Sequence, residues 1–205
     1  MTADRQDQHP TARLLIVGPQ GSGKGTQGVR VAEALGIPVV STGDIFRANI
    51  KDGTDLGKKV TAILDAGDLV PDELTSEIVR DRLSQDDAAT GFLLDGYPRN
   101  TAQVSHLDDF LSAQSAALDA VILLDVPREE SMARLGLRAV EQGRSDDTEA
   151  AIAHRLDIYE NETAPIISEY QERGIVDRID GVGSLDEITA RISAALGARG
   201  IGQLV

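Results

Sequence analysis

The stretch GPQGSGKGTQ, residues 18 to 27, places four glycines, a lysine and a threonine directly after the apolar run RLLIV of residues 13 to 17. Glycines let the backbone turn tightly and bring its amides close to phosphate oxygens, and a following helix adds the positive end of its dipole. Lys24 would reach the β- and γ-phosphates, and Thr26 offers a hydroxyl to phosphate or to Mg²⁺. The sequence therefore predicts a nucleotide phosphate loop, which switches, motors and kinases all share.

An aspartate ends the apolar segment GFLLD, residues 91 to 95. A carboxylate at the end of a strand beside a phosphate loop is well placed to hold the water shell of a magnesium ion. Asp95 is also explained as a simple turn former, but its pairing with the loop favours the magnesium role. We therefore expect Mg²⁺ to bind with the nucleotide and to be held by Asp95 through water.

Short apolar segments, mostly rich in Val, Ile and Leu, alternate with longer helical patterns along the chain. This alternation predicts an α/β fold with a parallel sheet covered by helices on both faces. The expected strands are 13–18, 37–41, 91–95, 119–125 and 175–180. The expected helices are 23–35, 43–52, 56–66, 72–85, 100–114, 128–142, 148–173 and 184–197.

Length and composition indicate one globular domain, since the chain has 205 residues of which 41% are hydrophobic. No apolar run could span a bilayer and residues 1–12 are polar, so we expect a disordered lead-in and a cytoplasmic protein. The net charge of −14 argues against nucleic acid and anionic membrane as partners. Without cysteine, and with His9, His106 and His154 scattered, no zinc is expected.

Further motifs identify a resemblance that covers almost the whole chain after residue 12. These are GKGTQ, STGDIFR (41–47), GDLVPDELT (67–75), GFLLDGYPRN (91–100), GRSDD (143–147) and RLDIYENETAPIISEYQERG (155–174). Together and in this order they resemble the adenylate kinases, of the short-lid bacterial type within the nucleoside monophosphate kinases. The resemblance implies reversible transfer of a phosphoryl group from MgATP to AMP, giving two ADP.

The resemblance also implies the organisation of the chain. It predicts a P-loop three-layer fold with a five-stranded parallel sheet over residues 13–199, followed by a tail at 200–205. A helical AMP-binding insert is expected at about 41–70 and a short lid at about 137–147. The long-lid branch often carries four zinc-binding cysteines, which this chain lacks. The family also implies a monomer whose partners are the small nucleotides ATP, AMP and ADP.

Site residues follow from the resemblance, position by position. For ATP it implies Gly21, Ser22, Gly23, Lys24, Gly25, Thr26, Arg138 and Gly183. For AMP it implies Thr42, Arg47, Asp68, Leu69, Val70, Gly96, Tyr97, Pro98, Arg99, Gln103, Arg144 and Arg155. The expected catalytic residues are Lys24, Arg99, Arg138, Arg144 and Arg155.

The roles within this set differ, as the resemblance implies. Arg99 would grip the α-phosphate of AMP, and Gln103 would read the edge of its base. Pro98 is expected to follow a cis peptide bond. Gly183 would make a backbone contact to the adenine of ATP. Whether Arg134 or Arg138 faces ATP stays open, because Gly136 stands between them.

The chemistry explains why arginines dominate this set. Phosphoryl transfer between two anions asks for alignment and for neutralisation of charge on the moving group. The guanidinium fork grips two oxygens at once and stays charged. No general base is needed, because a phosphate oxygen of AMP is already a nucleophile. Water would hydrolyse ATP in an open site, so closure over both substrates is expected.

Three alternatives remain beside this reading. The nearest is a UMP/CMP kinase of the same fold, against which Thr42 and Gln103 favour adenine. A GTP-dependent switch usually needs an Asn-Lys-x-Asp strand end, which this chain lacks. A catalytically silent nucleotide-binding protein is disfavoured because every expected cation is present. Arg128 and Arg134 are equally well explained as solvated charges on a helix face.

Overall fold

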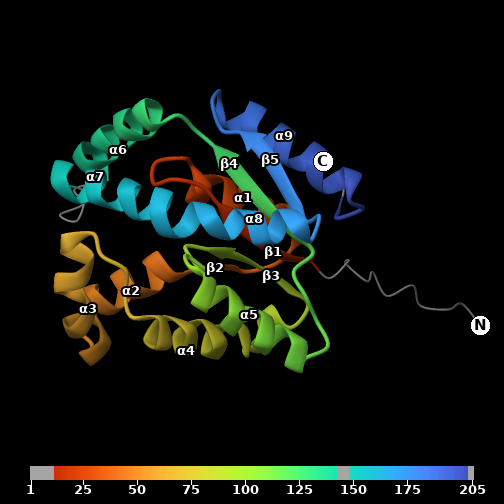
Figure 1. The fold of residues 1–205 in the computed structure, drawn as a ribbon, viewed down its shortest axis with the longest axis horizontal. Coiled ribbons are helices and arrows are strands. Elements are labelled where there is room, and N and C mark those ends of the chain that lie inside the picture. Colours follow the sequence, from red (N-terminus) through yellow and green to blue (C-terminus); the bar gives the residue numbers. More distant parts are fainter. Residues whose placement is uncertain (1–11, 143–147, 203–205) are drawn as a thin grey trace, which may run out of the picture.

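A computed structural model describes residues 12–142 and 148–202, the last five of the first range by their backbone only. Five parallel strands form one sheet in the order β2-β3-β1-β4-β5 (Figure 1). In chain order the strands are β1 (Ala12–Val17), β2 (Val39–Ser41), β3 (Gly91–Asp95), β4 (Ala120–Asp125) and β5 (Val176–Asp180). The prediction of an α/β fold with a five-stranded parallel sheet is confirmed.

Helices connect and cover these strands. They are α1 (Lys24–Leu35), α2 (Thr42–Lys51), α3 (Asp55–Ala66), α4 (Asp72–Leu83), α5 (Thr101–Ala113), α6 (Arg128–Gln142), α7 (Glu149–Ile158), α8 (Ala164–Glu172) and α9 (Leu185–Ala198). A short 3₁₀ turn, Asp86–Ala88, precedes β3 and was not expected from the sequence. No helix in the described parts of the chain is both long and apolar enough to cross a membrane.

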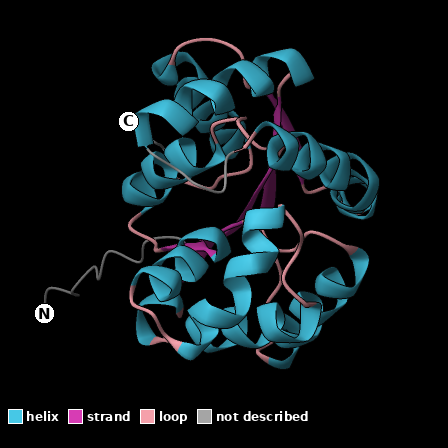
Figure 2. Cartoon of the chain, turned by 90° about the vertical axis from the view of Figure 1, so that its left-hand side faces the viewer, coloured by secondary structure: helices cyan, strands magenta, loops and turns pink. Residues whose placement is uncertain are grey.

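The sheet lies between two helical layers, which Figure 2 shows on either side of the strands. Alternate residues of β1 pack on opposite faces of the sheet, because successive side chains of a strand point to opposite sides. Leu15 and Val17 join the core cluster that includes residues of α4, α5 and α8. Leu14 and Ile16 join the cluster that includes residues of α1 and α9. Because both faces are covered, the central strands are apolar along most of their length.

Helices α2 and α3, together the helical insert, have a small core of their own. Phe46 on α2 and Val60 on α3 are almost fully buried and pack with Val70, which follows α3. The side chains of Ser41 and Thr54 each accept a hydrogen bond from a backbone N–H at the start of α2 and α3. The insert is thereby a compact unit beside the sheet (Figure 1).

The expected helix 148–173 is interrupted. Between α7 and α8 the segment Tyr159–Thr163, called the π turn below, has π-helical hydrogen bonding. Pro165 stands at the start of α8 and has no backbone N–H to donate to the preceding turn. A wider turn accommodates this missing bond while the chain continues in the same direction. The hydrophobic pattern of the sequence continues across the π turn, and this is why a single helix was expected over residues 148–173.

Candidate active site

The carboxyl ends of the strands bring the expected site residues to one edge of the sheet. Asp95 is the last residue of β3, paired in register with Ile16 of β1 on one side and Ser41 of β2 on the other. The phosphate loop follows β1, and Thr42 follows Ser41 directly. Gly183 lies in the loop between β5 and α9. In open parallel sheets ligands bind at this edge, where neighbouring loops diverge.

The phosphate loop turns tightly between β1 and α1. Gly21 and Gly23 have φ angles of 79° and 93°, which residues with side chains rarely adopt. A Cβ at Gly21 would lie 2.6 Å from the carbonyl oxygen of Ser131, so α6 packs directly on the loop. Lys24 Nζ donates hydrogen bonds to the carbonyl oxygens of Gly18 at 2.7 Å and Pro19 at 2.8 Å. The ammonium group is thereby held over the loop.

The start of α1 offers further groups to an anion. No side chain caps the N-terminus of α1 at Gly23, so the first N–H groups of the helix face the loop. Thr26 is exposed in the first turn, and Ser22 is buried within the loop. Because these donors converge with Lys24, the geometry fits a polyphosphate.

Asp95 faces the start of α1. Its Oδ2 lies 3.9 Å from the position that a Cβ would take at Gly25. Burial raises the pKa of Asp95 above its ordinary value, and the nearby charges of Lys24 and Arg99 act in the opposite direction. Burial also lowers the pKa of Arg99, opposed by the charge of Asp95. The side chains of Asp95 and Arg99 thus lie close together, shielded from solvent, at the centre of the carboxyl edge of the sheet.

Gly96 and the residues after it form the turn that holds Arg99. The carbonyl oxygen of Gly96 accepts hydrogen bonds from Thr42 Oγ1 at 3.0 Å and from Arg99 Nε at 2.7 Å. The peptide bond between Tyr97 and Pro98 is cis, as the resemblance implied. The turn therefore joins the end of β2 to the end of β3 and directs the guanidinium group of Arg99 along the edge.

The helical insert touches α7 through polar contacts. Arg155 donates a hydrogen bond to the carbonyl oxygen of Leu64 at 2.8 Å. His154 Nε2 lies 2.7 Å from Asp68 Oδ1. Both residues stand on α7, whereas Leu64 and Asp68 belong to the end of α3 and the loop after it. Two segments about ninety residues apart are thereby brought together over the edge of the sheet.

Two adjoining hollows lie at this edge. The first, the loop hollow, lies between the phosphate loop and the segment 96–99, and is lined in part by Lys24. The second, the insert hollow, lies beneath the helical insert. The predicted AMP residues that line the insert hollow are Thr42, Arg47, Asp68, Leu69, Val70, Gly96, Arg99, Gln103 and Arg155. Gln20, Gly96, Arg99 and Arg155 line both hollows. Tyr97 and Pro98 line the loop hollow instead.

Arg134 lies beside the phosphate loop, at the edge of the sheet. Its guanidinium donates to the carbonyl oxygen of Gly181 at 3.1 Å and approaches that of Ser22 at 3.5 Å. Its Nε pairs with Glu130 at 2.7 Å. Arg134 thus links α6, the phosphate loop and the loop after β5. Arg138 stands on α6 but its side chain lies outside the described residues, as does the whole of Arg144.

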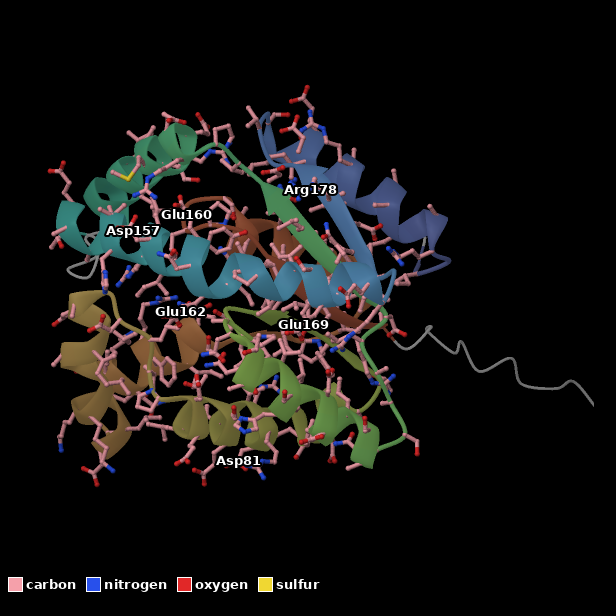
Figure 3. The ribbon with its side chains drawn as sticks, viewed as in Figure 1. Asp81, Asp157, Glu160, Glu162, Glu169 and Arg178 are labelled. Carbon is pink, nitrogen blue, oxygen red and sulfur yellow. The ribbon has the colours of Figure 1, made fainter. Side chains whose placement is uncertain are left out.

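Arg128 has a structural explanation. It pairs with Asp157 at 2.9 Å and with Glu160 at 2.7 Å. Figure 3 labels these two carboxylates on the helical segment next to α6. All three side chains are substantially exposed, so the contribution to stability is small. Arg128 therefore fixes α6 against α7 and stands outside both hollows.

Several lining residues were missed by the sequence reasoning. Gln20 lines both hollows, while Tyr159 and Thr163 of the π turn line the loop hollow and Thr75 the insert hollow. Gln20 stands inside the phosphate-loop motif, so its place in the loop was a usable signal. Nothing in the local pattern distinguishes the other three from core residues.

The fold and the glycine-rich loop are those of P-loop nucleotide-binding proteins. The family model for adenylate kinase matches residues 16–175. The adenylate kinase of Kocuria rhizophila is 58% identical over 184 residues, which cover 90% of this chain and 98% of that relative. Those of Leifsonia xyli subsp. xyli and Thermobifida fusca are 57% and 54% identical, covering 92% and 91% of this chain, and 94% and 99% of the relatives. The chain belongs to the adenylate kinase family.

Proposed function

We propose that this protein is an ATP:AMP phosphotransferase, which transfers a phosphoryl group from MgATP to AMP and gives two ADP. The observation that carries the proposal is the junction of the two hollows. The loop hollow contains Lys24 of the phosphate loop, the insert hollow contains Thr42 and Gln103, and Arg99 and Arg155 belong to both. Two nucleotides bound tail to tail would bring their phosphates together at these two arginines.

The donor nucleotide binds on the side of the phosphate loop. Backbone N–H groups from Gly21 to Thr26 bind its β- and γ-phosphates, together with the ammonium group of Lys24. The loop after β5, which contains Gly183, borders its adenine. Arg134 holds that loop and the phosphate loop at a fixed separation through Gly181 and Ser22. The resemblance to the family assigns Arg138 to the ATP side as well, and it assigns Arg144 and Arg155 to AMP and the transferred group.

The acceptor nucleotide binds in the insert hollow. Arg47 and Arg99 bind the α-phosphate of AMP, and the backbone from Asp68 to Val70 borders its base. Gln103 forms hydrogen bonds to the base edge. Support comes from the lining of the hollow, to which β2, the helical insert, the turn after β3 and α5 all contribute.

The transfer needs positioning and charge rather than acid–base chemistry. An oxygen of the AMP phosphate attacks the γ-phosphorus in line, and the β-phosphate of the donor leaves. Lys24, Arg99, Arg155 and the lid arginines Arg138 and Arg144 neutralise the charge that spreads over the moving group. The short lid and the helical insert close over the substrates and exclude water, which protects ATP from hydrolysis.

Magnesium accompanies the donor nucleotide and lowers the charge repulsion between its phosphates. The oxygen atoms of Asp95 and Thr26 fit this ion, because Mg²⁺ takes hard oxygen ligands and keeps several of its waters. Among the residues that the structure describes, no group of three or more metal-binding side chains gathers. We propose that the ion arrives with the nucleotide and is held by Asp95 through water. We further propose that the enzyme works as a monomer in the cytoplasm.

A direct comparison of acceptors tests the proposal. ADP production from MgATP is measured with AMP, CMP and UMP, and kcat/KM for AMP is expected to exceed the others by at least about a hundredfold. A matched variant, Lys24→Met, should lose at least about a hundredfold in kcat, which assigns the activity to this phosphate loop. Faster turnover with CMP or UMP would replace the proposal with a pyrimidine nucleotide kinase.

A further inference from the structure

We propose that Asp72 is a positioning residue that fixes the orientation of the Gln103 amide and thereby selects a 6-amino purine over a 6-oxo purine. The inference rests on the proposed function, in which Gln103 reads the base of the acceptor nucleotide. Asp72 begins α4 and Gln103 stands in the first turn of α5, 31 residues further along the chain. The resemblance to the family assigned no role to Asp72.

Both atoms of the Gln103 amide are held. Nε2 donates to Asp72 Oδ1 at 2.6 Å, and Oε1 accepts from the backbone N–H of Arg99 at 2.8 Å. Asn100 Nδ2 donates to the same oxygen of Asp72 at 2.9 Å. Asn100 also caps α5 by accepting from the backbone N–H of Gln103. Gln103 is only 2% exposed, so its amide bonds form out of contact with water.

These partners determine which way the amide points. An ionised carboxylate only accepts hydrogen bonds, and a backbone N–H only donates them. A rotation of the amide by 180° would place Oε1 against the carboxylate and the NH₂ group against the N–H of Arg99. Both contacts would become repulsive, and both would be buried, where unpaired polar groups are costly. The chemistry of the partners therefore assigns the amide orientation, independently of how its atoms are labelled.

The fixed amide keeps one unused hydrogen-bonding position on each atom. An amide nitrogen carries two N–H donors and its oxygen two lone pairs, of which Asp72 and Arg99 use one each. Gln103 lines the insert hollow. It therefore offers one donor beside one acceptor to a base in that hollow.

This pair complements adenine and opposes hypoxanthine. Adenine presents a ring nitrogen acceptor beside its 6-amino donor, so it matches a donor beside an acceptor. Hypoxanthine has an oxygen at position 6, and its N1 carries a hydrogen. A freely rotating amide would pair with either base by turning over. An amide held by Asp72 pairs with adenine alone.

Asp72 also has a simpler explanation, as a helix-end charge, and the experiment must distinguish this effect from the proposed one. It stands in the first turn of α4, where a negative charge stabilises the helix dipole. Glu73 stands in the same turn, and its side chain is exposed. Glu73→Gln therefore removes the same charge from the same helix end and leaves the Gln103 amide untouched. It is the matched control for Asp72→Asn.

The test measures kcat and KM for AMP and for IMP at saturating MgATP. IMP differs from AMP only at position 6 and N1, which isolates the proposed contact. In Asp72→Asn the new side chain can pair with the Gln103 amide in either orientation, so only the backbone N–H of Arg99 still favours the original one. We expect KM for AMP to rise about tenfold, kcat to stay within about twofold, and the preference for AMP over IMP to fall about tenfold. Glu73→Gln should keep all three values.

Other outcomes decide against the proposal. If Asp72→Asn loses activity toward AMP and IMP in equal proportion, Asp72 serves only the start of α4. If the preference is unchanged, the amide does not depend on Asp72. Where turnover of IMP is too slow to follow, the ratio of the Kd values for AMP and IMP from calorimetry gives the same answer. A wild-type protein that fails to phosphorylate AMP would overturn the proposed function instead.

Discussion

Two influences shift the pKa of Asp95 in opposite directions. Burial raises its pKa, while Lys24 and Arg99 favour its charged form. Because burial is the stronger influence, the folded protein binds the proton of Asp95 more tightly than the unfolded chain does. The role that we propose for Asp95, holding the water shell of magnesium, requires the carboxylate form. The surroundings of Asp95 therefore disfavour its carboxylate form until a further cation binds beside it.

A pH series on Asp95→Asn tests this. Between the ordinary and the raised pKa of Asp95, the folded state binds more protons than the unfolded state. The free energy of unfolding therefore falls as pH rises through this window. Asn does not titrate, so the variant should lack that fall and gain stability relative to wild type as pH rises. Urea unfolding without nucleotide, from about pH 4 to pH 8, measures the difference; curves that stay parallel would contradict it.

At the scale of residues, motifs predicted the charged part of the site better than the rest. Lys24 and Arg99 stand in short motifs whose spacing has a chemical reason. Asp72 and Tyr159 also stand in quoted motifs, GDLVPDELT and RLDIYENETAPIISEYQERG, but no chemical reason singled them out there, since each has an ordinary explanation, as a helix-end charge or as a core aromatic. Their importance depends on which residue faces them across the fold. Local sequence does not contain that information.

At the scale of elements, the boundaries followed from sequence because each has a local cause. The strand ends lie within two residues of the prediction, since four of the five short apolar runs stop at glycine or aspartate and the other stops at Ser41. The stretch Ser184-Leu-Asp-Glu187 has the sequence pattern of a capping box, and the structure contains that box at the start of α9. The π turn had no such signal, because one wider turn leaves the burial of the flanking helices unchanged.

Two helical glycines give a prediction at this scale. A Cβ at Gly57 would overlap the carbonyl oxygen of Asn49, so α3 crosses α2 at backbone contact. Gly57→Ala should push the helices apart, lower the free energy of unfolding by about 1–3 kcal/mol, and raise KM for AMP but not for ATP. Urea unfolding and steady-state kinetics measure both effects.

Gly136 supplies the matched control. It also lies within a helix, but a Cβ there would meet no atom within 4 Å. Gly136→Ala should therefore stabilise the protein by about 0.5–1 kcal/mol. If both alanine variants shift stability in the same direction, crowding at Gly57 is not the cause.

At the scale of the whole molecule, the site depends on contacts between distant segments. His154 and Arg155 on α7 meet the helical insert at Asp68 and Leu64, and the two hollows join beside them. The order of the motifs implied such a meeting only through the resemblance to a family. The chain itself gives no rule for which helix the insert should touch. The junction of the two hollows could therefore be identified only from the structure.

The junction predicts how a bisubstrate analogue should bind. A molecule that joins two adenosines through five phosphates should fill both hollows, with one molecule per chain. At a thousandfold excess over its Kd, it should stabilise the protein by about 4 kcal/mol and raise the Tm by about 10 °C. Calorimetry and thermal unfolding measure these values. A stoichiometry of two, or a Tm that does not move, would mean that the hollows do not act as one site.

The π turn also makes the chain sensitive to its length at one point. Arg155 lies before the turn, and Ile166 and Tyr170, which anchor α8 in the core, lie after it. The wider winding holds one residue more than an ordinary helical turn, so the helices on either side keep the same faces toward the core. Deleting the exposed Asn161 would force ordinary winding, and the ring of Pro165 would then press against the carbonyl oxygen four residues before it. The resulting kink would move Arg155 relative to the core while every buried contact of α8 stayed intact, so length variation among homologues should avoid the π turn.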